Sequence, residues 1–328
     1  MTVAVVLLGY ALILAAVAAP LLRRAGWVDR APRLAVALWQ ALTVTVLASV
    51  AMAGLALTVP TVRVSGDLAE LLRACVMALR EQYASPGGAA AGATGAVLAL
   101  GVLGRTGWCL GAAALRMVGE RSAHRRVLDM VARHDEHRGI VILESAESAV
   151  YCLPGRRRRT VVTTAALQAL DDGQLEAVLA HERAHLTERH DLILTLSRAL
   201  AAAFPALRLF RDAAGETARL VELRADDVAA SRTDRLTVAG ALLAVASGGA
   251  GHAVPSVALA AGGADAAARV RRLIPPNNPL GRAQAAAGSL AVAVLLALPL
   301  LVFGGPAAAA AQHNLCPDAA VPAYSATG

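Results

Sequence analysis

Two histidines stand four residues apart in the segment His181-Glu182-Arg183-Ala184-His185. On a helix, residues four apart share a face and lie about 6 Å apart along the axis, so both imidazole rings face one point. Imidazole nitrogens bind Zn²⁺ at about 2.0–2.1 Å. Glu182 follows the first histidine and is placed to act as a general base on water without ligating the metal. The spacing therefore predicts a catalytic zinc centre; the alternative is a solvated helix face with two exposed histidines.

A catalytic zinc ion takes three protein ligands and leaves one position open. The variant of the motif with a third histidine would place glycine at 188 and histidine at 191, but the chain has Glu188 and Asp191 there. His190 lies one residue out of register, so we interpret it as a solvated or helix-end histidine. The third ligand is therefore expected elsewhere in the chain.

A later segment supplies carboxylates at helical spacing. Glu222 and Asp226 are four residues apart and share one face of a helix. One of them can bind zinc while the other accepts a hydrogen bond from a ligand imidazole, which sets its tautomer. The alternative is an exposed helix whose acidic residues pair with Arg219 and Arg224. Together with the two histidines, we favour the zinc interpretation.

The histidine motif must lie on a helix, and the residues before it indicate one. Asp171 is a suitable N-cap, and Gln174, three residues later, completes a capping-box pattern. Leu175, Val178 and Leu179 then recur at helical spacing and predict a buried stripe.

Three short segments upstream predict a small sheet. Residues 139–143, 148–152 and 160–163 are rich in β-branched side chains or alternate in polarity, as strands do. A strand whose edge faces a metal cleft can pair with an extended peptide through main-chain hydrogen bonds. The alternative is that the sheet only packs against the zinc helix, and the two interpretations are compatible.

The motif lies in the charged part of an otherwise apolar chain. Of the 328 residues, 57% are hydrophobic and only 17% are charged, whereas soluble globular domains carry about 25% charged residues. This composition argues against an ordinary cytosolic enzyme and against a disordered chain. Residues 119–282 hold 22 of the 31 basic and 19 of the 24 acidic residues. We therefore expect one domain of ordinary charge beside nearly uncharged segments.

The net charge of +7 raises the question of nucleic-acid binding. The densest basic run, residues 156–159, follows a predicted turn and has no aromatic neighbours for base stacking. We interpret this run as a solvated loop or a contact with anionic lipid head groups, and we expect no direct nucleic-acid binding.

Four apolar segments are long enough for a helix to cross a bilayer, which takes about 20 residues. They are residues 1–22, 35–58, 88–115 and 283–304. A removable signal peptide is the alternative for the first, but no positive charge precedes it, and Arg23 and Arg24 follow it.

Arginine placement sets the expected orientation, because cytoplasmic loops carry the excess of basic residues. Arginines follow the first and third segments and precede the fourth, whereas none follows the fourth. We therefore expect the N-terminus outside the cell membrane, residues 119–282 in the cytoplasm, and a short extracytoplasmic tail at 305–328.

Two further patterns occur in apolar stretches. Gly107 and Gly111 have the small-xxx-small spacing of closely packed membrane helices. Residues 192–210 are apolar but contain Pro205 and two arginines, so we interpret them as a domain helix against the membrane and not as a fifth span.

These motifs carry a resemblance to a known family. The chain resembles integral-membrane gluzincin peptidases, and most of all the BlaR/MecR-type antirepressor peptidases, which are related to the HtpX and CAAX prenyl endopeptidases. The resemblance rests on residues 149–155, 161–164, 174–185 and 222–226, and residues 269–273 are similar to the basic segment that closes these domains.

The resemblance implies roles for individual residues. His181, His185 and Glu222 would hold one Zn²⁺ per chain, and Glu182 would be the general base. Asp226 would accept a hydrogen bond from a metal-binding histidine without ligating the metal itself. The segment at 269–273 does not indicate which arginine would support the site.

Two departures from the family pattern limit what is expected. Antibiotic-sensing members carry a penicillin-binding domain after the fourth span, whereas this sequence has only residues 305–328 there and no lysine for a Ser-x-x-Lys nucleophile. We therefore expect no β-lactam sensor. Prenyl endopeptidases have more spans than the four found here, which disfavours that substrate.

The expected fold is an α-helical membrane protein with four transmembrane helices and a cytoplasmic α+β zincin-like metallopeptidase domain between the third and fourth spans. The expected function is a zinc endopeptidase that cleaves cytoplasmic or membrane-adjacent proteins, and the resemblance makes a winged-helix repressor one candidate substrate. The alternatives are an HtpX-like quality-control protease and a non-catalytic zinc-bound signalling or scaffold protein.

Overall fold

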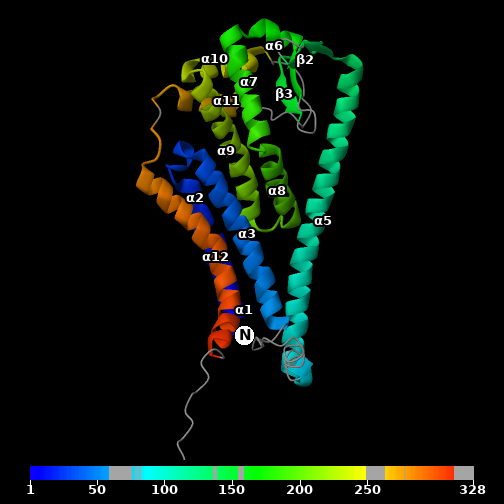
Figure 1. Cartoon of the computed structure of the whole chain (residues 1–328), viewed down its shortest axis with the longest axis vertical. Helices are drawn as coiled ribbons and strands as arrows, with labels where there is room; N and C mark the ends of the chain where they lie inside the picture. Colours follow the sequence, from blue (N-terminus) through cyan, green and yellow to red (C-terminus); the bar gives the residue numbers. More distant parts are fainter. Residues whose placement is uncertain are drawn as a thin grey trace, which may run out of the picture. The chain divides into compact units, whose positions relative to one another are not determined.

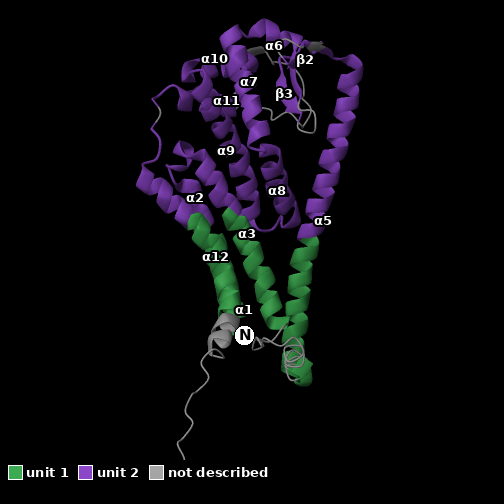
Figure 2. Cartoon of the chain, viewed as in Figure 1, with its two compact units in different colours: residues 1–18, 41–105, 291–328 green, residues 19–40, 106–290 purple. Residues whose placement is uncertain are grey.

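In the part of the chain that the structure describes, the protein is built mainly from helices, with one small sheet (Figure 1). The computed structural model describes residues 1–58, 76–77, 80, 83–135, 139–153, 159–248, 263–276 and 278–313. Residues 314–328 of the predicted tail, and residues 156–158 of the basic run, therefore lie outside the described residues. The chain divides into two compact units, coloured in Figure 2: residues 1–18, 41–105 and 291–328 form unit 1, and residues 19–40 and 106–290 form unit 2.

Among the residues that the structure describes, four helical segments are long and apolar enough to cross a membrane by length and composition. They span residues 2–24, 32–58, 86–131 and 282–305, and they overlap the four predicted spans. The first segment consists of α1 (Thr2–Ile13), a π-helical turn η1 (Leu14–Ala18) and α2 (Ala19–Arg24). The other three are α3 (Pro32–Thr58), α5 (Pro86–Val131) and the first part of α12 (Arg282–His313). Large apolar side chains such as Leu100 and Leu300 are exposed on them, as expected of surfaces that face lipid.

Helices α3 and α5 approach closely within unit 1, and two glycines make this possible. A Cβ added at Gly54 would lie 2.7 Å from the carbonyl oxygen of Gly95 and 2.8 Å from the backbone nitrogen of Ala99. Small residues at such a crossing let two helix backbones pack directly. The sequence pattern at Gly107 and Gly111 marks no such contact, because a Cβ at either position would meet nothing within 4 Å.

Unit 2 contains a four-stranded mixed sheet with the order β1-β2-β4-β3. Strands β2 and β4 are parallel, whereas β1 and β3 pair antiparallel with their neighbours. The three predicted strand segments are confirmed within two residues at each end, and the strands are β1 (Arg133–Asp135), β2 (Ile140–Leu143), β3 (Val150–Leu153) and β4 (Arg159–Thr163). In this order β3 is an edge strand.

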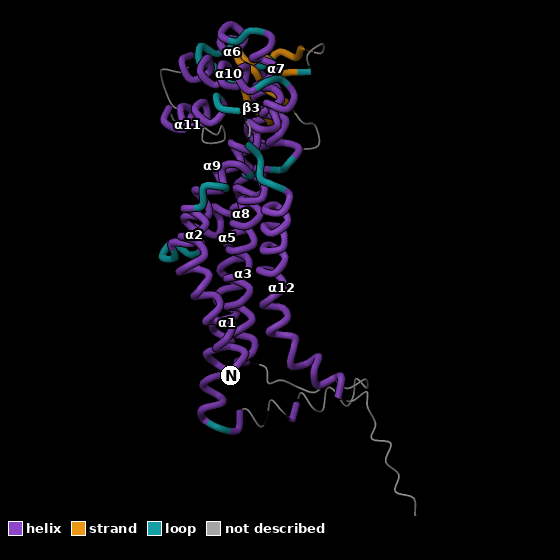
Figure 3. Tube along the Cα trace, turned by 90° about the vertical axis from the view of Figure 1, so that its left-hand side faces the viewer, coloured by secondary structure: helices purple, strands orange, loops and turns teal. Residues whose placement is uncertain are grey.

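Both faces of the sheet are covered, because alternate residues of a strand point to opposite sides. Ile140 and Val162 pack into the core formed with α6 (Thr164–Ala169), α7 (Asp172–Thr187) and α10 (Arg235–Gly248). Val141 and Val161 pack on the other face, against Leu128 near the end of α5. Figure 3 shows the strands beside α6, α7 and α10.

The remaining helices of unit 2 pack around α7. Helix α9 (Arg208–Arg232) packs against both α7 and α8 (His190–Ala203), and α11 (Gly263–Leu273) packs against α10. The interpretation of residues 192–210 as one helix was wrong. The chain breaks between Ala203 and Arg208, because Pro205 has no backbone N–H to continue a helix, and two helices result.

The glycine crossing in unit 1 yields a stability prediction. Gly54→Ala forces a methyl group against the backbone of α5, and such overpacking costs about 1–3 kcal/mol. The matched control is Gly101→Ala on α5, where a Cβ meets nothing within 4 Å. Thermal unfolding of the full chain in detergent should show a lower Tm for the first variant only. An equal response of both variants would contradict the crossing.

Candidate active site

Helix α7 carries the histidine motif and begins as its sequence predicts. Asp171 Oδ1 accepts a hydrogen bond of 2.7 Å from the backbone N–H of Gln174, and Gln174 Oε1 accepts one of 3.2 Å from the backbone N–H of Asp171. This capping box satisfies two backbone donors that the first turn would otherwise leave unpaired. Leu175 and Leu179 are buried in the core, and this anchors the face of α7 opposite to solvent.

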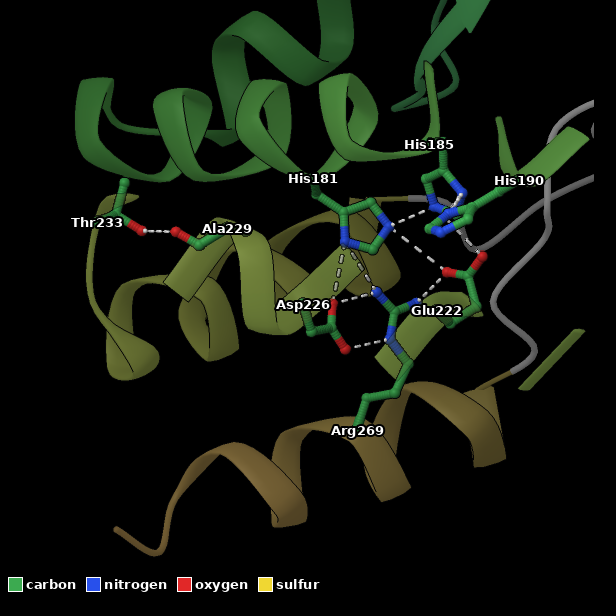
Figure 4. A network of polar contacts seen from close by, with 8 residues as sticks. All are labelled: His181, His185, His190, Glu222, Asp226, Ala229, Thr233 and Arg269. Carbon is green, nitrogen blue, oxygen red and sulfur yellow. Dashed lines mark hydrogen bonds and ion pairs between the residues drawn. The ribbon is translucent and has the colours of Figure 1, made fainter. Parts of the chain in front are cut away.

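His181, His185 and Glu222 come together in a three-residue cluster that could hold a metal ion. Their ligand atoms all lie within 4.8 Å of one another. The Nε2 atoms of His181 and His185 are 3.1 Å apart, and each lies 3.5 Å from an oxygen of Glu222, which α9 presents to α7 (Figure 4). The structure thus brings Glu222 close to two histidines that lie at least 37 residues earlier in the chain.

Glu222 and His185 have charge states that suit a divalent cation, whereas His181 must lose a proton to bind one. Burial lowers the pKa of His181, but its hydrogen bonds with Asp226 and Glu222 outweigh burial and raise this pKa to about 9. Burial raises the pKa of Glu222, but the hydrogen bond and charge of His181 and the charges of His185 and Arg269 outweigh it and lower this pKa to about 2. Burial lowers the pKa of His185 to about 3, and the charge of His181 adds to this effect. A carboxylate and a neutral imidazole are the forms that bind metals. In addition, Glu222 Oε1 is buried without a hydrogen-bond partner among the described residues, as expected of a ligand atom. The residues therefore fit a zinc ion.

Asp226 and Arg269 support the cluster from behind. Asp226 Oδ1 lies 3.0 Å from Nδ1 of His181, on the side of the ring away from the other ligands. The guanidinium of Arg269, on α11, donates to both oxygens of Asp226 at 2.6 and 2.8 Å, and its NH1 lies 2.9 Å from Glu222 Oε2. Burial raises the pKa of Asp226, but the hydrogen bonds from Arg269 and His181 outweigh it and hold this pKa well below its usual range.

The structure selects Arg269 from the basic segment that the sequence left unresolved. Its side chain is buried, whereas Arg271 is exposed and Arg272 binds Asp227. The alternative partners considered for the acidic pair are wrong: Arg219 binds Asp29 and Glu216, and Arg224 binds Glu188.

Glu182 lies beside the cluster and next to the edge strand. The side chain of Glu182 is half-buried in this site, and desolvation raises its pKa to about 7, although the charge of His181 opposes the shift. The backbone N–H of Cys152 on β3 donates to the Glu182 carboxylate. A carboxyl group with a pKa near 7 exchanges protons readily at neutral pH, which suits a general base.

The interpretation of His190 as a solvated residue was wrong. It does begin helix α8, but only 3% of it is exposed. Its Nδ1 lies 3.0 Å from Nδ1 of His185, and the two rings meet edge to face. Its burial could not be read from spacing, because a reversal of the chain after α7 brings it back under the motif.

A cavity of about 710 Å³ within unit 2 opens onto the cluster. Its walls come from α5, β3 and α7 to α11, and they include His181, Glu182, His185 and Glu222. Much of the lining is apolar, with Trp108 and Met117 from α5, Leu194 from α8, and Val238 and Leu242 from α10 among its members. The geometry therefore offers a metal site, a base and an apolar space for a ligand in one place.

Comparison with known proteins agrees with this chemistry. Residues 112–273, just under half of the chain, match peptidase family M48. This range contains all five residues predicted for the site, and the match supports an M48-family metallopeptidase. No curated protein and no solved structure matches the chain.

The buried pair of Arg269 and Asp226 yields a second stability prediction. Arg269→Met leaves two carboxylates buried without their cation, and breaking a buried pair in this way costs about 3–5 kcal/mol. For the full chain in detergent without metal, we expect Tm to fall by roughly 10 °C. The matched control is Arg271→Met on the exposed face of α11, which should leave Tm unchanged. A similar Tm for both variants would show that the hydrogen bonds from Arg269 to Asp226 contribute little to the stability of the fold.

Proposed function

We propose that this M48-family metallopeptidase is a membrane-bound zinc endopeptidase of the gluzincin type. The observation that supports this most directly is the convergence of His181, His185 and Glu222 beside a half-buried Glu182 in one cavity. The rival interpretation is a zinc-bound scaffold without turnover. It leaves unexplained why a carboxyl group with a pKa near 7 lies half-buried next to the metal site.

His181, His185 and Glu222 would hold the zinc ion, and Asp226 and Arg269 would orient them. When bound, zinc supplies a Lewis acid that polarises the scissile carbonyl group and makes water more acidic. Glu182 then accepts a proton from the attacking water and passes it to the leaving amine. Its own proton affinity suits both steps, because a pKa near 7 allows uptake and release at neutral pH.

The substrate would bind as an extended chain along β3. Among the described strands, only β4 pairs with this edge strand, and residues 150–152 of β3 line the cavity. An extended peptide can add to such an edge through main-chain hydrogen bonds, whatever its side chains. The backbone N–H of Cys152 already points at Glu182, so a peptide on this edge would pass the base.

The apolar lining favours substrate segments with apolar side chains. Cytoplasmic or membrane-adjacent proteins are the proposed substrates, with the catalytic domain on the cytoplasmic side of the cell membrane. Cleavage of a winged-helix repressor rests on the family resemblance alone. The cavity lining favours the second candidate role, cleavage of damaged membrane proteins, since their exposed spans are apolar.

The first test separates catalysis from metal binding. Glu182→Gln removes the base and leaves the three ligands, so the full chain in detergent should keep its zinc and lose at least about 100-fold in cleavage rate. The matched control, Glu176→Gln, alters an exposed residue of the same helix and should retain activity. Zinc content by atomic emission and cleavage of a disordered protein such as casein are the readouts. Persistent cleavage by Glu182→Gln would rule out the mechanism.

The second test concerns the cavity. Ala113 lines it, whereas Ala114 is exposed on α5 and does not. Ala113→Phe should fill part of the space and raise KM for a protein substrate by roughly 10-fold, with zinc content unchanged. Ala114→Phe should behave as the parent protein. Equal KM values for both variants would mean that substrates bind elsewhere.

A further inference from the structure

The two metal-binding histidines have different partners behind them. Each ring points its Nε2 atom into the metal site, so its Nδ1 atom faces the protein. Behind His181 that atom meets a carboxylate, Asp226, at 3.0 Å. Behind His185 it meets another imidazole, His190, at 3.0 Å (Figure 4).

A metal bound at Nε2 determines where the protons must lie. The metal takes the lone pair of His185 Nε2, so the proton of a neutral His185 lies on Nδ1. His190 Nδ1 must then accept that proton in a hydrogen bond, and the proton of His190 itself lies on Nε2. That atom faces Glu188 Oε2 at 3.5 Å. The chain of contacts therefore ends on a carboxylate, as it does behind His181.

Glu188 is held in place by an arginine. Arg224 donates to both of its oxygens, with Nε at 3.0 Å from each and NH2 at 2.6 Å from Oε1. Such a two-point contact holds a carboxylate in one orientation. Arg224 lies on α9, two residues after the ligand Glu222. The same helix thus supplies a metal ligand and the arginine that orients this second support.

The backbone is bent to bring His190 to this place. On a continuous helix, His190 would lie about 140° around the axis from His185 and could not touch its ring. The chain instead leaves α7 at Glu188 and turns at Arg189, which has a left-handed conformation with φ 53° and ψ 42°. A non-glycine residue there is uncommon and costs free energy, so the reversal is maintained by its surroundings.

We propose that His190 is a positioning residue for the metal site, which holds His185 in the metal-binding tautomer and passes its hydrogen bond on to the Glu188–Arg224 pair. The inference rests on the proposed zinc site, since it assigns His190 a role through a metal ligand. Supports of this kind contribute roughly 10- to 100-fold to metal affinity. A role in packing alone would depend on the size of the residue and not on its acceptor atom.

Three variants of the full chain in detergent separate these roles. His190→Leu keeps the volume but removes the acceptor, whereas His190→Gln provides a carbonyl oxygen for His185 and an amide for Glu188. Glu188→Gln weakens the end of the chain of contacts. The control is His124→Leu, which removes a half-buried histidine that hydrogen bonds to Tyr151 outside the cluster.

Zinc affinity by chelator competition and the visible spectrum of the Co²⁺-substituted protein are the readouts. We expect His190→Leu to bind zinc roughly 10- to 100-fold more weakly than the parent, with an altered Co²⁺ spectrum. His190→Gln should recover most of the affinity and the spectrum, Glu188→Gln should fall between them, and His124→Leu should match the parent. The Tm of each metal-free variant reports whether it folds.

The inference would be overturned if His190→Leu had the zinc affinity and the Co²⁺ spectrum of the parent. It would also be overturned if His190→Leu and His190→Gln lost zinc affinity equally. If His190→Leu does not fold, an unchanged zinc affinity of Glu188→Gln overturns it instead. Neither result bears on the proposed function, which fails if the parent protein binds zinc but cleaves nothing.

Discussion

The structure of unit 2 depends on one buried interaction, the pair of hydrogen bonds that Arg269 donates to Asp226. Charged groups removed from water must be paired, because an isolated buried charge costs several kcal/mol. Here the pair joins α9 to α11, and its Asp226 also holds His181 of α7. Three helices thus meet at one set of charges, and the orientation of the first histidine follows from their packing.

The surroundings of this pair are built from small apolar residues. Ala177, Ala180, Ala184, Ala225 and Ala229 are buried on α7 and α9, so the two helices come close enough for Glu222 to reach both histidines. The same principle operates in unit 1 with glycine, where Gly54 and Gly95 let α3 and α5 touch. A chain rich in alanine and glycine therefore obtains its specificity from short distances between backbones more than from large side chains.

Local sequence patterns predicted much of unit 2. The capping box at Asp171, the three strand segments and the shared helix face of Glu222 and Asp226 were readable, because each depends on periodicity or on spacing within one element. The assignment of Glu222 as the metal ligand came from the family resemblance. The choice of Arg269, the burial of His190 and the glycine crossing were not readable. These features depend on which helices face one another and on the left-handed conformation of Arg189, which reverses the chain. A pattern within one helix or strand carries no information about either. The crossing of the membrane and its sidedness remain predictions from hydropathy and arginine placement.

The edge position of β3 has a consequence for how substrates would be selected. A strand edge at the wall of a cavity accepts a chain only if that chain has free backbone N–H and C=O groups, and residues inside a folded helix or sheet have none to offer. A protease of this design would discriminate by conformation before sequence. The free energy needed to open a segment locally would then set how fast each protein is cut, so a stable protein would be spared even if it carried a suitable sequence.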